Sequence, residues 1–311
     1  MPNSEGNRPV IPVLTGPTGS GKTGVALELL KLYPQLNIIS CDSRQIYKRL
    51  SIGTDKPSPD ILKKYNFFLT DFIEPGERYT VFDFVEDADR IIGESLDKPN
   101  FPPLVCGGTG LYIQGLTEGI VEIPDGDFSI RDELENLTIT RGPQFLFEEL
   151  EKVDPDEAAQ VHPHNIKKII RALEIYRLTG KSKTELHEKS EHRKPDYDFE
   201  TVCLLPPREE LYEKINNRVD QMIESGLESE VRKLVTDGYR TAVETVNVIG
   251  YNEFFKYFDG ELSFDSAVNL IKQNSRRYAK RQITWFRGMA NLKIIDNKNE
   301  IIDDLHKYWA N

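Results

Sequence analysis

Short apolar runs alternate with helical stretches in the first part of the chain. Residues 9–15, PVIPVLT, form an apolar run bounded by proline and glycine, which is typical of a fully buried strand. Residues 21–32 then repeat valine and leucine at helical spacing, and a second apolar run opens at residue 36. A further run at residues 103–106, PLVC, also ends in glycines. This succession of strand, glycine turn, helix and strand predicts an α/β fold built on a parallel sheet.

The pattern changes between residues 116 and 200. A charged, helical pattern divided by prolines replaces the β-branched runs there. We interpret residues 116–200 as a mostly helical insertion, and residues 1–115 and 201–311 as the core that it interrupts. Residues 201–206, TVCLLP, predict a strand that returns to this core. Three helices are predicted after it, at residues 211–234, 246–258 and 264–286.

Composition is that of an ordinary globular protein. The 311 residues allow about two domains, and 40 basic against 51 acidic residues give a net charge of −11. No apolar stretch approaches the roughly 20 residues that a bilayer span needs, and the first residues lack the layout of a secretory signal. We therefore expect a cytoplasmic protein without a membrane partner. Three distant cysteines (Cys41, Cys106 and Cys203) indicate neither a disulfide framework nor a structural zinc site.

A phosphate-binding loop lies between the first predicted strand and helix. Its sequence, GPTGSGKT, fits the pattern G-x-x-x-x-G-K-[ST]. Glycines let consecutive backbone N–H groups face one anion, the helix N-terminus adds partial positive charge, Lys22 supplies a cation, and the Thr23 hydroxyl can ligate Mg²⁺. The expected diphosphate-binding residues are Gly16, Pro17, Thr18, Gly19, Ser20, Gly21, Lys22 and Thr23. The motif favours a P-loop NTPase-like core with helices on both sheet faces, but it leaves open whose phosphates are bound.

Asp42 is the candidate carboxylate beside this loop. An ordinary P-loop NTPase needs an apolar strand that ends in a magnesium-directed Asp, whereas PLVC ends in Cys106-Gly107-Gly108-Thr109. Asp42 instead follows the second apolar run and stands where ligand chemistry occurs in such sheets. Position alone leaves three roles open for it: a metal ligand, a base or a structural cap.

Several segments in order along the chain carry a family resemblance. After GPTGSGKT they are DSRQIY at 42–47, IGTDKP at 52–57, GGTGLY at 107–112, RALE at 171–174, IGY at 249–251 and KRQITWFR at 280–287. With these segments the chain resembles the tRNA dimethylallyltransferases, also called tRNA isopentenyltransferases. Such enzymes are similar to P-loop kinases in fold. They transfer a dimethylallyl group from dimethylallyl diphosphate to N6 of adenosine 37, next to the anticodon, in tRNAs that read codons starting with U.

The resemblance implies roles for individual residues. Asp42 would accept a proton from the adenine amine, while Arg218 and Thr23, with Mg²⁺ as cofactor, would meet the charge that develops on the departing diphosphate. Contacts to the anticodon stem-loop of tRNA are expected from Asp42, Ser43, Arg44, Gln45 and Thr109. Gln45 can form two hydrogen bonds with the N6 and N7 edge of adenine. Reaching N6 also requires that the base leaves its stack and enters a pocket.

The acidic total conceals two basic stretches. Residues 162–194 contain nine Lys and Arg against four Glu, a net of +5, and residues 272–287 contain six Lys and Arg with no acid, a net of +6, so the remainder sums to −22. We expect tRNA phosphates to meet Lys167, Lys168 and Arg171 in the first stretch and Lys280 and Arg281 in the second. A solvated charged face is the alternative for both stretches. Trp285 and Phe286, at helical spacing, are expected in the core.

Other functions and two departures from the family pattern stay open. An adenylate isopentenyltransferase acting on free nucleotide, a P-loop small-molecule kinase that binds ATP, and a non-catalytic RNA-binding protein are the alternatives. The basic insertion favours tRNA, because a small substrate needs no such surface. Asn66-Phe67-Phe68 replaces a pair of histidines, and Asn247 stands where some members have Arg. We expect the first departure to alter strand packing and the second to affect one tRNA contact, and we expect a monomer.

Overall fold

The computed structural model describes residues 8–98, 100–120, 126–189 and 197–310. The chain divides into two compact units, one formed by Met1–Glu118 with Pro195–Asn311 and the other by Gly119–Lys194. Each unit is described by itself below. None of the helices within the described ranges is long and apolar enough to cross a bilayer.

A six-stranded sheet organises the first unit. All its strand pairs are parallel and the strand order is β3-β2-β4-β1-β5-β6. The strands are β1 (Val10–Thr15), β2 (Asn37–Ser40), β3 (Asn66–Phe68), β4 (Pro103–Gly107), β5 (Asp198–Leu204) and β6 (Leu292–Ile295). β1 lies at the centre, with Val13 opposite Val105 of β4 and Thr201 of β5. Because parallel strands all end at one edge, the loops after β1, β2 and β4 lie close together.

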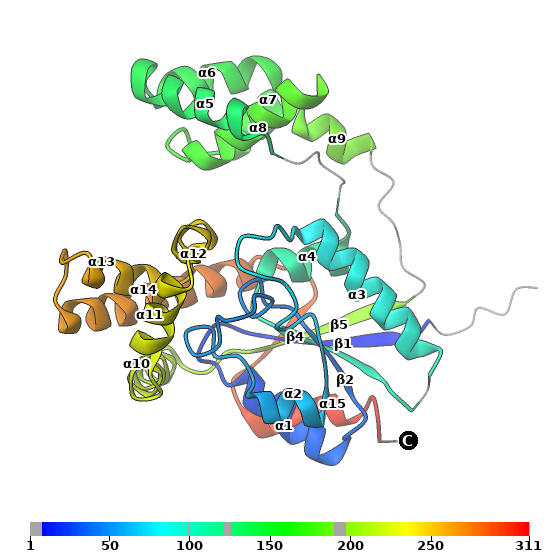
Figure 1. Ribbon diagram of the computed structural model, residues 1–311. Helices are drawn as coiled ribbons and strands as arrows, with labels where there is room; N and C mark the ends of the chain where they lie inside the picture. Colours follow the sequence, from blue (N-terminus) through cyan, green and yellow to red (C-terminus); the bar gives the residue numbers. More distant parts are fainter. Residues whose placement is uncertain (1–7, 99, 121–125, 190–196, 311) are drawn as a thin grey trace, which may run out of the picture. The chain divides into compact units, whose positions relative to one another are not determined.

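Helices cover both faces of this sheet (Figure 1). Val13 belongs to a buried cluster with residues of α3 (Val81–Leu96) and α4 (Gly110–Glu118). Its neighbour Leu14 belongs to a second cluster with residues of α1 (Lys22–Leu32) and α15 (Lys298–His306). Successive side chains of a strand point to opposite faces, so the continuous apolar run of β1 fits burial on both sides. The predicted P-loop NTPase-like α/β core is confirmed.

Five helices, α10 to α14, gather beyond the carboxyl ends of the strands (Figure 1). The single helix predicted at residues 211–234 is wrong: the structure has α10 (Arg208–Glu224) and α11 (Leu227–Thr236). Gly226 between them has φ of 94°, in the left-handed region that ends a helix. The helix predicted at residues 246–258 is also wrong at its start, because α12 (Arg240–Val246) ends where it should begin. Asn247 has φ of 56°, and α13 (Tyr251–Phe258) follows.

The remaining elements add detail to the predicted pattern. The helix expected at residues 264–286 is α14 (Phe264–Arg287). The return strand β5 starts three residues earlier than expected and ends two residues earlier. The sequence pattern did not predict α2 (Pro59–Lys64), α3, α12, α15 or the two short edge strands, β3 and β6. Asn66 of β3 donates its side-chain amide to Asn37 Oδ1 at 3.0 Å, so this departure from the family pattern takes part in strand packing.

The second unit is helical in its described part. It contains α5 (Phe128–Arg141), α6 (Pro143–Val153), α7 (Pro155–Gln160), α8 (Ile166–Thr179) and α9 (Lys183–Lys189). Leu134, Leu146, Leu150 and Ile169 centre its own hydrophobic core. Since it has a separate core, this unit can present charged helix faces without disturbing the sheet.

Candidate active site

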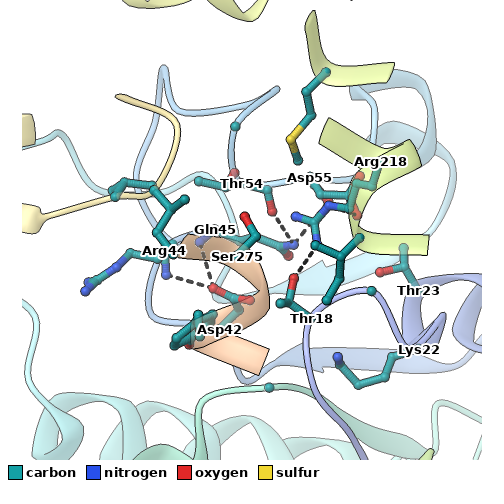
Figure 2. Close-up of a pocket in the computed structure, with 18 of the residues that line it drawn as sticks. Thr18, Lys22, Thr23, Asp42, Arg44, Gln45, Thr54, Asp55, Arg218 and Ser275 are labelled. Carbon is teal, nitrogen blue, oxygen red and sulfur yellow. Dashed lines mark hydrogen bonds and ion pairs between the residues drawn. The ribbon is translucent and has the colours of Figure 1, made fainter. Parts of the chain in front are cut away.

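A cavity of about 620 Å³ lies at the carboxyl ends of the strands. Its wall combines the phosphate-binding loop, the segments after β2 and β4, and residues of α10, α13 and α14. Asp42, Arg44 and Gln45 lie at one part of the lining, and Thr18, Lys22, Thr23 and Arg218 at another (Figure 2). A volume of this size is typical of small-molecule sites, and it suits a diphosphate together with a flipped base.

The phosphate-binding loop is held by its own lysine and by contacts with α10 and α14. Lys22 Nζ donates to the carbonyl oxygens of Gly16 at 2.7 Å and Pro17 at 2.9 Å. Burial lowers the pKa of Lys22, and electrostatic interactions with Cys106 and Asp42 act in the opposite direction. Gly19 packs on α10, since a Cβ there would lie 2.7 Å from Ile215 Cγ1. A partly buried cation facing a glycine loop is suited to an anionic ligand.

Arg218 joins the same loop from α10. Its Nη1 donates to Thr18 Oγ1 at 2.5 Å, and its Nε lies 3.4 Å from Asp55 Oδ2. The side chain is 25% exposed. Arg218 and Thr18 are 200 residues apart in the chain, yet the structure brings the predicted arginine into direct contact with the phosphate-binding loop, residues 16–23, which is called the cradle below. Together with Lys22 this arrangement places two cations around one anion site.

Asp42 caps the turn that follows β2. Its Oδ1 accepts hydrogen bonds from the backbone N–H of Arg44 at 2.9 Å and of Gln45 at 3.3 Å. Ser43 N donates to Thr109 Oγ1 at 3.0 Å, so the turns after β2 and β4 are tied to each other. Of the three roles left open for Asp42, the cap is therefore present. Both bonds use Oδ1, and Oδ2 forms no hydrogen bond to another described residue.

Gln45 and Arg44 both line the cavity after β2, but they differ in their contacts. The amide nitrogen of Gln45 donates to the carbonyl oxygens of Thr54 at 3.2 Å and Asp55 at 3.1 Å. Pairing with the N6 and N7 edge of adenine uses the carbonyl oxygen and one amide N–H, so one of these two bonds would have to open. Arg44 Nη1 donates to Ser43 O at 3.3 Å, and its side chain also lines the cavity.

Gln282 is a site residue that sequence reasoning missed. It is 7% exposed, accepts from Thr18 N at 2.8 Å and donates to Gly108 O at 2.8 Å. It therefore joins the phosphate-binding loop to the turn after β4. The only signal in the sequence is a polar residue on the buried stripe of α14. Tyr278, one turn earlier, also lines the cavity, and burial raises the pKa of its hydroxyl to about 12.

The basic residues on α14 and α8 have unequal surroundings. Lys280 is exposed, and Arg281 lines the cavity with its guanidinium 5.6 Å from the Tyr278 ring centroid. On α8, Lys167 and Lys168 are exposed, whereas Arg171 lies 2.6 Å from the buried carboxylate of Glu174. Arg131 also pairs with that carboxylate at 3.1 Å. Arg171 therefore has a structural role in the insertion, whatever it contributes to RNA.

The aromatic pair on α14 divides between core and surface. Phe286 is 1% exposed, as expected of a core residue, but Trp285 is 42% exposed and the expectation for it is wrong. Trp285 packs against the turn after β4: a Cβ at Gly110 would lie 2.4 Å from Trp285 Cδ1. A glycine at that position is what allows the indole ring to approach the backbone.

The hydroxyl groups of the loop fit a hard cation. No cluster of three His, Cys, Asp or Glu side chains suited to a metal occurs in the described part of the chain. Mg²⁺, however, is commonly held by few protein oxygens together with phosphate oxygens and waters. Thr23 lines the cavity, and Ser20 Oγ is buried with no hydrogen-bond partner within the described ranges. The Thr23 hydroxyl in the cavity wall fits a cation that arrives with a diphosphate.

Comparisons with known proteins point in one direction. The family model described as IPP transferase matches residues 45–289. The chain is 40% identical over 305 residues to the tRNA dimethylallyltransferase of Acetivibrio thermocellus, covering 96% of each chain, and 42% identical over 277 residues to that of Thermotoga maritima, covering 89% of each. A crystal structure of the Bacillus halodurans tRNA isopentenylpyrophosphate transferase has 36% identity and a TM-score of 0.66, over 97% of this chain and 95% of that one. A eukaryotic dimethylallyltransferase acting on tRNA has 26% identity and a TM-score of 0.73, over 89% and 70%.

Proposed function

This chain belongs to the IPP transferase family, and we propose that it transfers the dimethylallyl group of dimethylallyl diphosphate to N6 of adenosine 37 in tRNA. The products are N6-dimethylallyladenosine, next to the anticodon of tRNAs that read codons starting with U, and diphosphate. We place this activity in a cytoplasmic monomer. The observation that carries the proposal is one cavity lined both by the two-cation cradle and by Asp42.

The cradle accounts for the departure of diphosphate. The glycine loop, Lys22 and Arg218 offer backbone N–H donors and two cations where negative charge grows as the carbon–oxygen bond breaks. Mg²⁺, held by Thr23 and the diphosphate itself, would supply further charge neutralisation when bound. Since Arg218 already contacts Thr18, little reorganisation is needed during the reaction.

Asp42 accounts for the proton. As N6 of adenine forms a bond to the allylic carbon, the electron pair of the carbon–oxygen bond leaves with diphosphate and N6 must lose a proton. Oδ1 is occupied by the turn, so Oδ2 is the oxygen that accepts this proton. A carboxylate is a weak base, and its fixed position beside the cavity supplies the advantage.

The insertion favours tRNA over a free nucleotide. Lys167 and Lys168 are exposed on α8, and neither is needed to bind a small molecule. Lys280 and Arg281 extend basic charge to the mouth of the cavity on the first unit. Backbone phosphates bind such groups, whereas the acidic remainder of the surface repels RNA.

A transfer assay tests the proposal. Purified protein is incubated with Mg²⁺, dimethylallyl diphosphate and a tRNA that carries A36-A37-A38, and nucleosides are identified by mass spectrometry after digestion. Dimethylallyladenosine at position 37 and release of diphosphate are expected, and EDTA should stop both. The matched control is the same tRNA with guanosine at position 37. Hydrolysis of ATP alone, or prenylation of free AMP but not of tRNA, would refute the proposal.

A further inference from the structure

Glu230 of α11 lies outside the cavity lining and binds the backbone of the loop that follows the site. Its carboxylate accepts from Ser51 N at 3.1 Å, from Ile52 N at 3.0 and 3.1 Å, and from Gly53 N at 3.4 Å. Three successive N–H groups converge on one carboxylate, which is the geometry of a backbone anion nest. Neither the sequence motifs nor the proposed mechanism uses this residue.

Tyr251 of α13 completes the arrangement. Its hydroxyl donates to Glu230 Oε1 at 2.5 Å, and burial raises the pKa of this hydroxyl. The ring is fully buried and lies against Gly53, where a Cβ would be 2.3 Å from Tyr251 Cε2. Glycine is therefore required at position 53 by a close approach. Glu230 and Tyr251 together hold the loop through its backbone, from two helices that belong to the cluster beyond the sheet.

The 51–55 loop, held in this way, contacts both Gln45 and Arg218. The carbonyl oxygens of Thr54 and Asp55 accept the two hydrogen bonds that the side-chain amide of Gln45, three residues after Asp42, donates. The carboxylate of Asp55 lies 3.4 Å from Arg218 Nε, and Arg218 in turn contacts Thr18 of the cradle. A shift of the loop would thus displace Gln45, which is expected to contact the nucleotide, and Arg218, which is expected to contact the diphosphate.

We propose that Glu230, with Tyr251, is a positioning residue for the transfer reaction: it fixes the 51–55 loop so that Gln45 and Arg218 stand in register with Asp42 and the cradle. This inference rests on the proposed function. Glu230 acts on the site only through the 51–55 loop. Its loss should therefore change the positions of Gln45 and Arg218 rather than the binding of tRNA. Catalytic rates respond steeply to such displacement, up to roughly a hundredfold for about 1 Å.

Glu230→Gln tests this directly. The amide has the size of the carboxylate, but its NH₂ group faces backbone N–H groups that need an acceptor, so the loop must move. We expect the single-turnover rate of prenyl transfer to fall by about tenfold to a hundredfold. Diphosphate affinity, measured by calorimetry with Mg²⁺ and inorganic diphosphate, should fall by about tenfold through Arg218, while the Kd for tRNA changes by less than about twofold. Tyr251→Phe, which removes one hydroxyl donor and keeps the ring, should show the same pattern with a smaller loss.

Glu228→Gln is the matched control. Glu228 lies on the same helix and pairs with the exposed Arg232 at 2.6 Å, so its loss should leave all three quantities at wild-type values. Thermal melts report the folded fraction of each variant. Wild-type rate and diphosphate affinity in Glu230→Gln, or losses that only track the unfolded fraction, would overturn the inference. If wild-type protein transfers no prenyl group, the proposed function fails, and the diphosphate affinities of the variants still decide the role of Glu230.

Discussion

Asp42→Asn separates the chemical role of this side chain from its structural one. The Asp42 Oδ1 atom caps the N–H groups of Arg44 and Gln45, and an Asn carbonyl oxygen can accept the same two bonds. The substitution therefore keeps the turn and removes the ability to accept a proton. Asp42→Ala, by contrast, also removes the cap.

The two effects can be told apart. Backbone hydrogen bonds to a charged acceptor contribute about 1.5–3 kcal/mol and those to a neutral one about 1 kcal/mol, so for the two bonds together Asp42→Asn should destabilise the fold by about 1–4 kcal/mol. Domain stabilities of about 5–15 kcal/mol leave the variant folded. Loss of a general base slows a reaction by about 10²- to 10⁴-fold, which corresponds to about 3–5 kcal/mol in the barrier. A loss of that size cannot come from unfolding.

The measurement is the single-turnover rate of dimethylallyl transfer to tRNA, with tRNA binding and thermal melts on the same samples. We expect a rate lower by at least about 10²-fold, with tRNA binding unchanged or tighter because a negative charge near RNA is removed. A rate within about threefold of wild type would show that Asp42 is a cap only and that the proton goes elsewhere. It would also favour the kinase interpretation, which tolerates Asn at this position.

Three further predictions concern the cations. Arg218→Gln should lower diphosphate affinity and slow transfer by about 10²-fold without changing the Kd for tRNA; equal loss of tRNA binding would contradict its place on the leaving group. Burial lowers the pKa of Lys22 from its ordinary 10.5, so its buried charge costs stability below the folded pKa and this cost disappears as pH rises toward 10.5. Because the pKa is lowered, Lys22 loses its positive charge at a lower pH than a free lysine. Calorimetry should therefore show that diphosphate affinity falls at alkaline pH in wild type but not in Lys22→Met, and parallel pH curves for the two proteins would contradict this. Lys167→Ala and Lys168→Ala should each reduce the magnitude of the salt slope of tRNA binding by about 0.7–0.9, whereas Arg171→Ala should chiefly lower the melting temperature of the insertion; unchanged slopes would identify a solvated face.

The sequence by itself determined the features that depend on short stretches of chain. Strand β1, the phosphate-binding loop and helix α1 were predicted together because apolar runs, glycines and helical spacing act locally. The edge strands β3 and β6 were not predicted, because three or four residues are too few to show an alternation of apolar and polar positions. The end of α10 before Gly226 was not predicted, because the sequence does not show whether a glycine inside an apolar helical pattern has a positive φ.

Only the tertiary structure decided which distant residues complete the site. Gln282 meets Thr18 across 264 residues, Arg218 meets Thr18 across 200, and Glu230 meets the 51–53 backbone across nearly 180. Periodicity assigns such residues to a helix and to one of its faces, but not to a partner. The partners are set by how the helices beyond the sheet pack against its carboxyl edge, where most buried polar groups form hydrogen bonds. Those contacts join the cradle, Asp42 and the 51–55 loop into one candidate active site.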